Sequence, residues 1–133
     1  MTDAAINQDQ NEQDNQQGLS DEQIREVAIA LDNEETPKVS EVLEVLNEAD
    51  TAELLEKLDD DNRKTVLENH ADEIDPYTYF YLDPELRKNT LSVMPADKVA
   101  KIVAELDSDD ALDIILNLDE DFQKEIIRKL SYR

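Results

Sequence analysis

Large apolar residues recur along this chain with a period of twelve. From Leu46 onward the twelfth positions hold an apolar residue or, once, a histidine: Leu46, Leu58, His70, Leu82, Met94, Leu106, Leu118 and Leu130. Seven blocks of twelve residues run from Asn47 to Leu130 without a gap. The eighth and ninth positions are nearly all apolar as well, so each block carries an i, i+1, i+4 stripe on one helical face. The pattern predicts one short helix per block.

Each block opens with residues that favour a turn or a helix cap, namely Asp59, Asp83-Pro84, Pro95, Asp107-Ser108 and Asp119. A carboxylate there accepts backbone N–H bonds and suits the positive end of the helix dipole. The helices are then about nine residues long, which is marginal for an isolated helix, so they must pack on their neighbours. Arg63-Lys64 and Arg87-Lys88 match at a spacing of 24 residues. We therefore predict an all-α solenoid of short antiparallel helices, arranged in 24-residue pairs.

Two further helices are expected ahead of the blocks. Residues 1–18 are rich in Gln, Asn and Asp and cannot bury enough apolar surface to offset their ordering entropy, so we predict a disordered polar tail. A helical-repeat domain then spans residues 19–133. Ser20 and Gln23 fit a capping box at its first helix. Thr36 as cap and Pro37 at the first helical position predict a second helix.

The third block departs from the pattern. Asp75-Pro76 restarts its helix late, and four aromatic residues follow: Tyr77, Tyr79, Phe80 and Tyr81. We expect this aromatic cluster to thicken the core, with a partner-binding patch as the alternative. His70 stands where other blocks have Leu or Met, and we expect it to be half-buried in packing. Arg63, Lys64, Arg87 and Lys88 are expected to pair with neighbouring carboxylates rather than bind phosphate.

Charge and composition limit the classes of function that this chain can have. The chain holds 35 Asp and Glu against 13 Lys and Arg, a net charge of −22. Such a surface repels nucleic acid and anionic lipid and attracts cations or basic partners. The lack of cysteine, the single histidine and the absence of a Gly-rich loop leave no nucleophile motif, so we do not expect an enzyme. No apolar run is long enough to insert into a bilayer, and the N-terminus is no signal peptide.

The later blocks resemble a known family. The segment from Asp107 to Leu118, DSDDALDIILNL, resembles the D-P-D-D-A-A-D-L-L-E-E-L segment of MgtE-type magnesium transporters. The segments ELLEKL from Glu53 and DPELR from Asp83 are similar to earlier repeats of the same domain, so the resemblance runs roughly from Glu35 to Arg133. Ser108, Leu112 and Asn117 depart from the usual Pro, Ala and Glu, but the acidic positions are kept.

The resemblance implies the cytosolic N-terminal domain of such a transporter, on the cytoplasmic side of the bacterial inner membrane. Its fold is a superhelix of short helices, which we expect to be right-handed. In the family this domain is followed by CBS domains, a connecting helix and a membrane pore, and the transporter is a homodimer. The chain stops about where the CBS pair would begin, so we expect an excised domain or a free-standing relative. Its own core does not require a partner, which suits a monomer.

Asp109 and Asp113 are the candidate Mg²⁺ ligands. They lie i, i+4 on the predicted helix, so their carboxylates share a face, and Asp110 could join from one side. Mg²⁺ takes oxygen ligands, keeps several waters and is often held by one or two carboxylates, so this face suits weak, water-mediated binding. In the family, acidic residues of this domain meet acidic residues of the CBS region, and bound Mg²⁺ favours the closed pore. We expect Asp109 and Asp113 to play that part.

Two alternatives stay open at this stage. Asp109 and Asp110 lie in the first turn of their helix, where carboxylates are favoured by the dipole alone, and Asp113 could be a solvated residue. The acidic runs Asp59-Asp60-Asp61 and Asp119-Glu120-Asp121 are read as caps and first turns. A flagellar motor switch protein has helical repeats that resemble this domain, so a free-standing protein-interaction module without ion sensing is the alternative function. Among all these interpretations, only magnesium sensing depends on Asp113.

Overall fold

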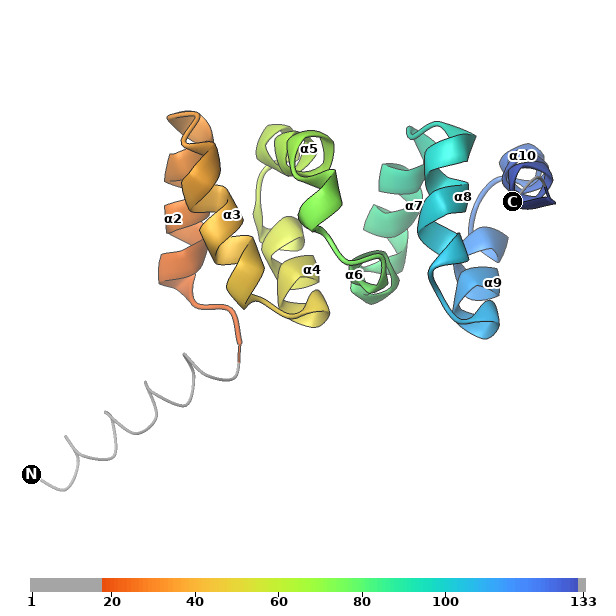
Figure 1. The fold of residues 1–133 in the computed structure, drawn as a ribbon, viewed down its shortest axis with the longest axis horizontal. Helices are drawn as coiled ribbons and strands as arrows, with labels where there is room; N and C mark the ends of the chain where they lie inside the picture. Colours follow the sequence, from red (N-terminus) through yellow and green to blue (C-terminus); the bar gives the residue numbers. More distant parts are fainter. Residues whose placement is uncertain (1–17, 132–133) are drawn as a thin grey trace, which may run out of the picture. The chain divides into compact units, whose positions relative to one another are not determined.

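A computed structural model describes residues 18–131, and the predicted tail of residues 1–18 lies almost entirely outside the described residues. Within them the protein is all-helical and contains no strand, which confirms the predicted fold class. The chain divides between Ile74 and Asp75 into two compact units. Figure 1 gives the helix labels used below. The right-handed superhelix stays a prediction, because each unit is described by itself.

The first unit holds four α-helices and one turn of 3₁₀ helix. These elements are α2 (Asp21–Asp32), α3 (Thr36–Val45), α4 (Glu48–Lys57), α5 (Asp60–Asn69) and η1 (Ala71–Glu73). Helix α2 packs against α3 and α5, and η1 also contacts α3 and α5. The apolar stripes of these helices therefore meet within one small core.

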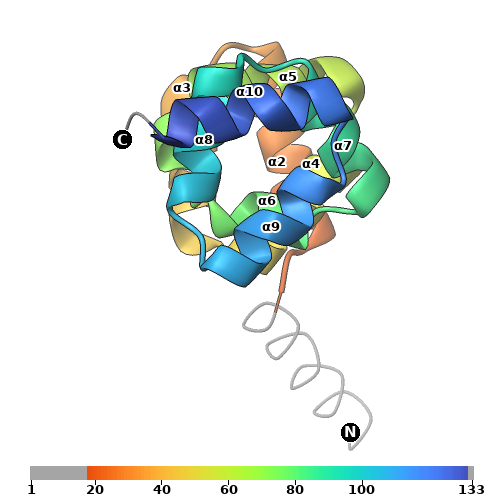
Figure 2. The same ribbon diagram turned by 90° about the vertical axis from the view of Figure 1, so that its right-hand side faces the viewer.

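The second unit holds five α-helices, drawn in green to blue in Figure 1. They are α6 (Tyr77–Tyr81), α7 (Pro84–Ser92), α8 (Ala96–Ala104), α9 (Ser108–Leu116) and α10 (Glu120–Ser131). Helix α10 packs mainly against α8, and both also contact α9. Figure 2 shows α10 lying across α8, with α9 and α10 nearest the viewer. Helices α8, α9 and α10 therefore pack on helices one or two places away along the chain, as a solenoid requires.

The twelve-residue phase appears directly in the helix starts. Helices α4, α5, α7, α8, α9 and α10 begin at residues 48, 60, 84, 96, 108 and 120. In the third block, where residue 72 would begin a helix, the chain forms η1 and then α6, so Asp75-Pro76 does delay the helix as predicted. The chain recovers its phase at α7, so the irregularity stays within one block.

Side-chain caps begin several helices, and two of these caps are acidic residues. Ser20 and Gln23 form the predicted capping box, with the Gln23 N–H donating to Ser20 Oγ at 3.1 Å. Asp59 accepts from the Asn62 N–H at 2.7 Å, and Asp83 accepts from two N–H groups of α7. The prediction for Thr36 was wrong: it is the first helical residue, and the cap before it makes no side-chain bond.

The core follows the block position of a residue more closely than its type. Most eighth and ninth positions are buried, as the stripe predicts, and the exceptions are Thr90, Ile102 and Ile127. The third block obeys the same rule, with Thr78 and Tyr79 at these positions and Tyr79 only 3% exposed. The prediction that this aromatic cluster thickens the core is therefore confirmed for Tyr79 and wrong for Tyr81. Tyr81 is 53% exposed, and Phe80 packs edge-on against Tyr77 and Tyr81.

Where the fifth block position holds a long polar side chain, that side chain donates to carbonyl groups at the end of the preceding helix. Arg63 Nε donates to the Leu55 carbonyl at 2.7 Å, and its Nη2 donates to the Leu58 carbonyl at 2.9 Å. Gln123 Nε2 donates to the Leu118 carbonyl at 2.7 Å. The basic residues thus do more than the predicted pairing with carboxylates, although Arg63 also bonds Asp60 at 2.8 Å.

Replacing Arg63 by Met should lower the free energy of unfolding by about 2–3 kcal/mol, because two helix-end carbonyls and Asp60 lose their donor. Urea denaturation followed by circular dichroism measures the change. Lys64→Met is the matched control: Lys64 is exposed, and its loss should cost no more than about 0.5 kcal/mol. Equal effects of the two substitutions would contradict the assignment of Arg63 as a helix-end donor.

Stability should fall at alkaline pH through Tyr79. Burial raises the pKa of Tyr79 to about 12, so the folded state favours the neutral phenol. An unfolded tyrosine ionises near pH 10, so this contribution is complete below about pH 10 and is lost as pH rises toward 12. The loss should be about 2 kcal/mol between pH 9 and pH 11.5, measured by urea denaturation at the two pH values. Tyr79→Phe should remove most of this pH dependence, and Tyr81→Phe should leave it in place.

Candidate functional site

The predicted acids lie at the start and middle of α9. Ile114 and Ile115 are buried and fix the rotation of this helix, which leaves the opposite side in solvent. That side, which we call the outer face of α9, consists of Asp109, Leu112, Asp113 and Leu116, all exposed. Asp109 and Asp113 therefore share one solvent-exposed face, one helical turn apart.

Asp110 has a different environment from Asp109 and Asp113. It is half-buried, and the Tyr77 hydroxyl donates to its Oδ2 at 3.1 Å. The same hydroxyl accepts from the Asp107 N–H at 3.1 Å, where the side chain of Asp107 makes no cap bond of its own. Tyr77 thus joins α6 to the start of α9. This contact spans 30 residues or more and leaves no local pattern in the sequence.

The electrostatics at Tyr77 follow from these partners. The Asp107 N–H acts to lower the pKa of the Tyr77 phenol, but partial burial and the carboxylates of Asp110 and Asp107 outweigh it and raise the pKa overall. The phenol therefore stays protonated near neutral pH and acts as a donor to Asp110. The Asp110 carboxylate therefore already accepts a hydrogen bond from Tyr77 within the second unit.

Asp113 lies within electrostatic range of a buried cation. Arg87 is only 9% exposed, and its Nη1 donates to the Phe80 carbonyl at 3.2 Å. Burial lowers the pKa of Arg87, while the charges of Asp113 and Asp83 act to raise it. The charge of Asp113 thus favours the charged form of the Arg87 guanidinium.

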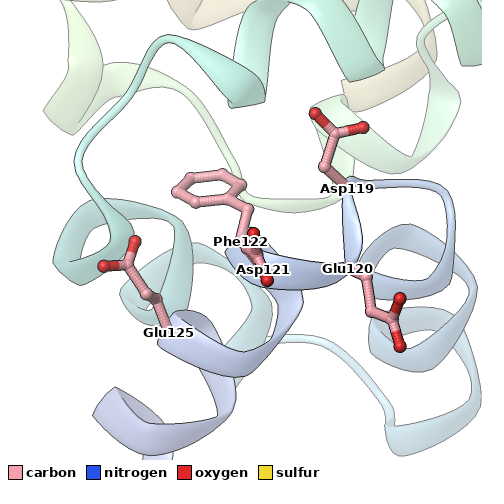
Figure 3. Close-up of a pocket in the computed structure, with 5 residues that line it drawn as sticks. All are labelled: Asp119, Glu120, Asp121, Phe122 and Glu125. Atoms are coloured by element: carbon pink, nitrogen blue, oxygen red, sulfur yellow. The ribbon is translucent and has the colours of Figure 1, made fainter.

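A shallow hollow lies at the start of α10, away from the predicted acids. Its volume is about 590 Å³, and it is lined by Asp119, Glu120, Asp121, Phe122 and Glu125. Figure 3 shows the Phe122 ring between Asp119 and Glu125, with Glu120 pointing away. Glu120 and Asp121 lie in the first turn of α10, and Lys88 Nζ approaches Asp119 at 3.9 Å. The position of Glu120 and Asp121 confirms the first-turn part of the prediction for this acidic run.

No preformed metal cage is present in residues 18–131: no three His, Cys, Asp or Glu side chains there are close enough together to hold an ion. The assignment of Asp109, Asp113 and Asp110 to Mg²⁺ therefore stays a prediction.

The only histidine is buried in the first unit, more deeply than the half-buried position we expected. His70 Nδ1 lies 2.5 Å from Glu73 Oε2 and 3.5 Å from Ser40 Oγ. The Ser40 hydroxyl and the His70 ring lower the pKa of the Glu73 carboxyl. Serine and carboxylate here meet the same ring nitrogen, whereas a catalytic triad places them on opposite nitrogens. The cluster is a packing contact between α3 and η1.

Comparison with known families decides the identity of the domain. The family described as the MgtE intracellular N domain matches residues 46–133, about two thirds of the chain. The chain belongs to this family. The MgtE N domain is a regulatory domain of magnesium transporters and is not a known enzyme family. No curated protein and no solved structure matches the chain.

The extent of the MgtE match refines the resemblance seen in the sequence. It begins at Leu46, just before the first twelve-residue block, and not at Glu35 as the resemblance suggested. Helices α2 and α3 therefore precede the matched region, and α4 to α10 lie within it. No helix in the described part of the chain is both long and apolar enough to cross a membrane.

The Tyr77 hydroxyl should contribute to the stability of the MgtE N domain. Tyr77→Phe leaves the Asp107 N–H and the Asp110 carboxylate without their shared partner, so we expect the free energy of unfolding to fall by about 1 kcal/mol. Urea denaturation measures this change, and the exposed Tyr81→Phe serves as control. A Tyr77→Phe variant as stable as the wild type would show that the phenol makes no net contribution.

Proposed function

We propose that this domain senses Mg²⁺ for an MgtE-type transporter through Asp109 and Asp113. Its membership of the MgtE intracellular N domain family supports a role in magnesium transport. The observation that carries the finer assignment is the exposure of both carboxylates, one turn apart on the outer face of α9. Two such carboxylates can hold a hydrated Mg²⁺ through its waters without a closed protein cage.

Regulation follows from the charge of the domain. The net charge of −22 opposes the approach of another acidic surface, such as the CBS region that follows this domain in the family. A divalent cation between the two surfaces offsets that repulsion and binds the compact arrangement better than the open one. The ion therefore shifts the population toward the compact arrangement, which favours the closed pore. Asp110, which accepts the Tyr77 hydroxyl, contributes mainly negative potential.

A Mg²⁺ titration followed by NMR tests the assignment residue by residue. At constant ionic strength, the amide signals of Asp109 and Asp113 should shift saturably in the wild type. The Asp109→Asn, Asp113→Asn double variant should lose these shifts, because the neutral amides no longer attract the ion.

The matched control is Glu22→Gln, Glu26→Gln. These two acids are also exposed and i, i+4, but they lie on α2, ahead of the family match. The control removes the same charge and should keep the α9 shifts. Mg²⁺-induced shifts that survive in the α9 double variant, or that spread evenly over all acidic residues, would overturn the assignment.

A further inference from the structure

The start of α9 is held in a different way from the starts of α4, α5 and α7. At those three helices the side chains of Asn47, Asp59 and Asp83 accept N–H bonds from the first turn. Asp107 holds the same place before α9, but its side chain makes no such bond. The Asp107 N–H instead donates to the Tyr77 hydroxyl of α6, at 3.1 Å. A side chain of another helix therefore takes part in this helix start.

The Tyr77 hydroxyl lies between two groups that a capping box would join directly. In a capping box, the side chain at the third helical position accepts the N–H of the cap residue. The third helical position of α9 is Asp110. The hydroxyl accepts from the Asp107 N–H and donates to Asp110 Oδ2, both at 3.1 Å. The Asp110 carboxylate is therefore bonded to α6 and half-buried, whereas Asp109 and Asp113 are exposed.

Asp110 is nevertheless a neighbour of the proposed magnesium ligands. Asp110 and Asp113 are i, i+3, so their side chains lie next to each other on the helix surface. At about 100° per residue, Asp113 lies between Asp109 and Asp110 around the helix, roughly 60° from Asp110. A carboxylate at this position can turn toward an ion beside Asp113 once the bond to Tyr77 is removed. The Tyr77 hydroxyl thus withholds a third carboxylate from a face that has two.

We propose that Tyr77 sets the ion selectivity of this face, because it limits the available carboxylates to two. This role rests on the proposed binding of Mg²⁺ by Asp109 and Asp113. Mg²⁺ keeps several of its waters and is often held by one or two carboxylates, whereas Ca²⁺ takes roughly six to eight oxygen ligands in a flexible geometry. A third carboxylate therefore helps Ca²⁺ more than Mg²⁺. With Asp110 bonded to Tyr77, the face favours Mg²⁺ over Ca²⁺.

The chemistry of the phenol makes this role separable from charge. The Tyr77 phenol is neutral, so Tyr77→Phe leaves the net charge unchanged and changes only the freedom of Asp110 to turn. An ion held through its waters responds mainly to the charge of the nearby carboxylates, which is the same in both forms. An ion that exchanges its waters for carboxylate oxygens also responds to whether a third carboxylate can reach it.

Parallel Mg²⁺ and Ca²⁺ titrations of the full chain test the proposal, with affinities measured from the α9 amide shifts in NMR at constant ionic strength. Tyr77→Phe should raise the affinity for Ca²⁺ at least about fivefold and the affinity for Mg²⁺ no more than about twofold, because Ca²⁺ gains a ligand. A purely structural role of Tyr77 would change both affinities alike and leave their ratio unchanged. Circular dichroism checks that each variant keeps its helices.

Asp110→Asn identifies the added ligand. In the Tyr77→Phe, Asp110→Asn double variant, the ratio of the Ca²⁺ affinity to the Mg²⁺ affinity should return to its wild-type value. Asp110→Asn alone should lower the two affinities by similar factors, because it removes one negative charge near either ion. Tyr81→Phe is the matched control, since Tyr81 is an exposed tyrosine of the same helix, and it should leave both affinities unchanged.

Two results would overturn the role of Tyr77. The first is an affinity ratio that Tyr77→Phe leaves unchanged, which would mean that the freed Asp110 bonds the Asp107 N–H directly, as in a capping box. The second is a raised ratio that persists in the double variant, because Asp110 is then not the added ligand.

The Asp109→Asn, Asp113→Asn variant separates this proposal from the proposed site itself. Mg²⁺-induced shifts that survive in that variant overturn the site, and the role of Tyr77 with it. Shifts that are lost there, together with an affinity ratio that Tyr77→Phe leaves unchanged, keep the site and overturn only the role of Tyr77.

Discussion

A helix of nine or ten residues leaves four N–H groups and four C=O groups without partners inside the helix. In this chain that is a large share of every helix, so the structure depends on how the helix ends are satisfied. Asp59 and Asp83 accept N–H bonds at the starts, while Arg63 and Gln123 donate to carbonyls at the ends of the helices before them. Because each helix end needs its neighbour, the short helices are stable together and would be marginal alone.

The sequence predicted what repeats and could not predict contacts between distant residues. Period and caps located the helix starts, and the block position predicted burial better than residue type, as Tyr79 and Tyr81 show. The bond between Tyr77 and Asp110 joins residues 33 apart, and the burial of Arg87 near Asp113 depends on how α7 and α9 lie in the unit. Neither has a local pattern, because both follow from packing.

The same limit applies to the candidate site. Helical spacing alone placed Asp109 and Asp113 on one face, and the structure leaves both in solvent there. Spacing also suggested Asp110 as a third ligand, but its carboxylate already accepts the Tyr77 hydroxyl. No lysine or arginine occurs from Asp107 to Asp121, but the buried Arg87 of α7 lies within electrostatic range of Asp113 and offsets part of its charge.

The third block shows how changes in chain length can be accommodated. A residue inserted within a helix would turn the rest of its apolar stripe by about 100° and carry it out of the core. In the third block a 3₁₀ turn, a bend at Asp75-Pro76 and a five-residue helix together occupy the space of one regular block, and α7 then begins in phase. Insertions and deletions should therefore be tolerated at the links between helices, or as whole blocks of twelve residues, but not inside a helix.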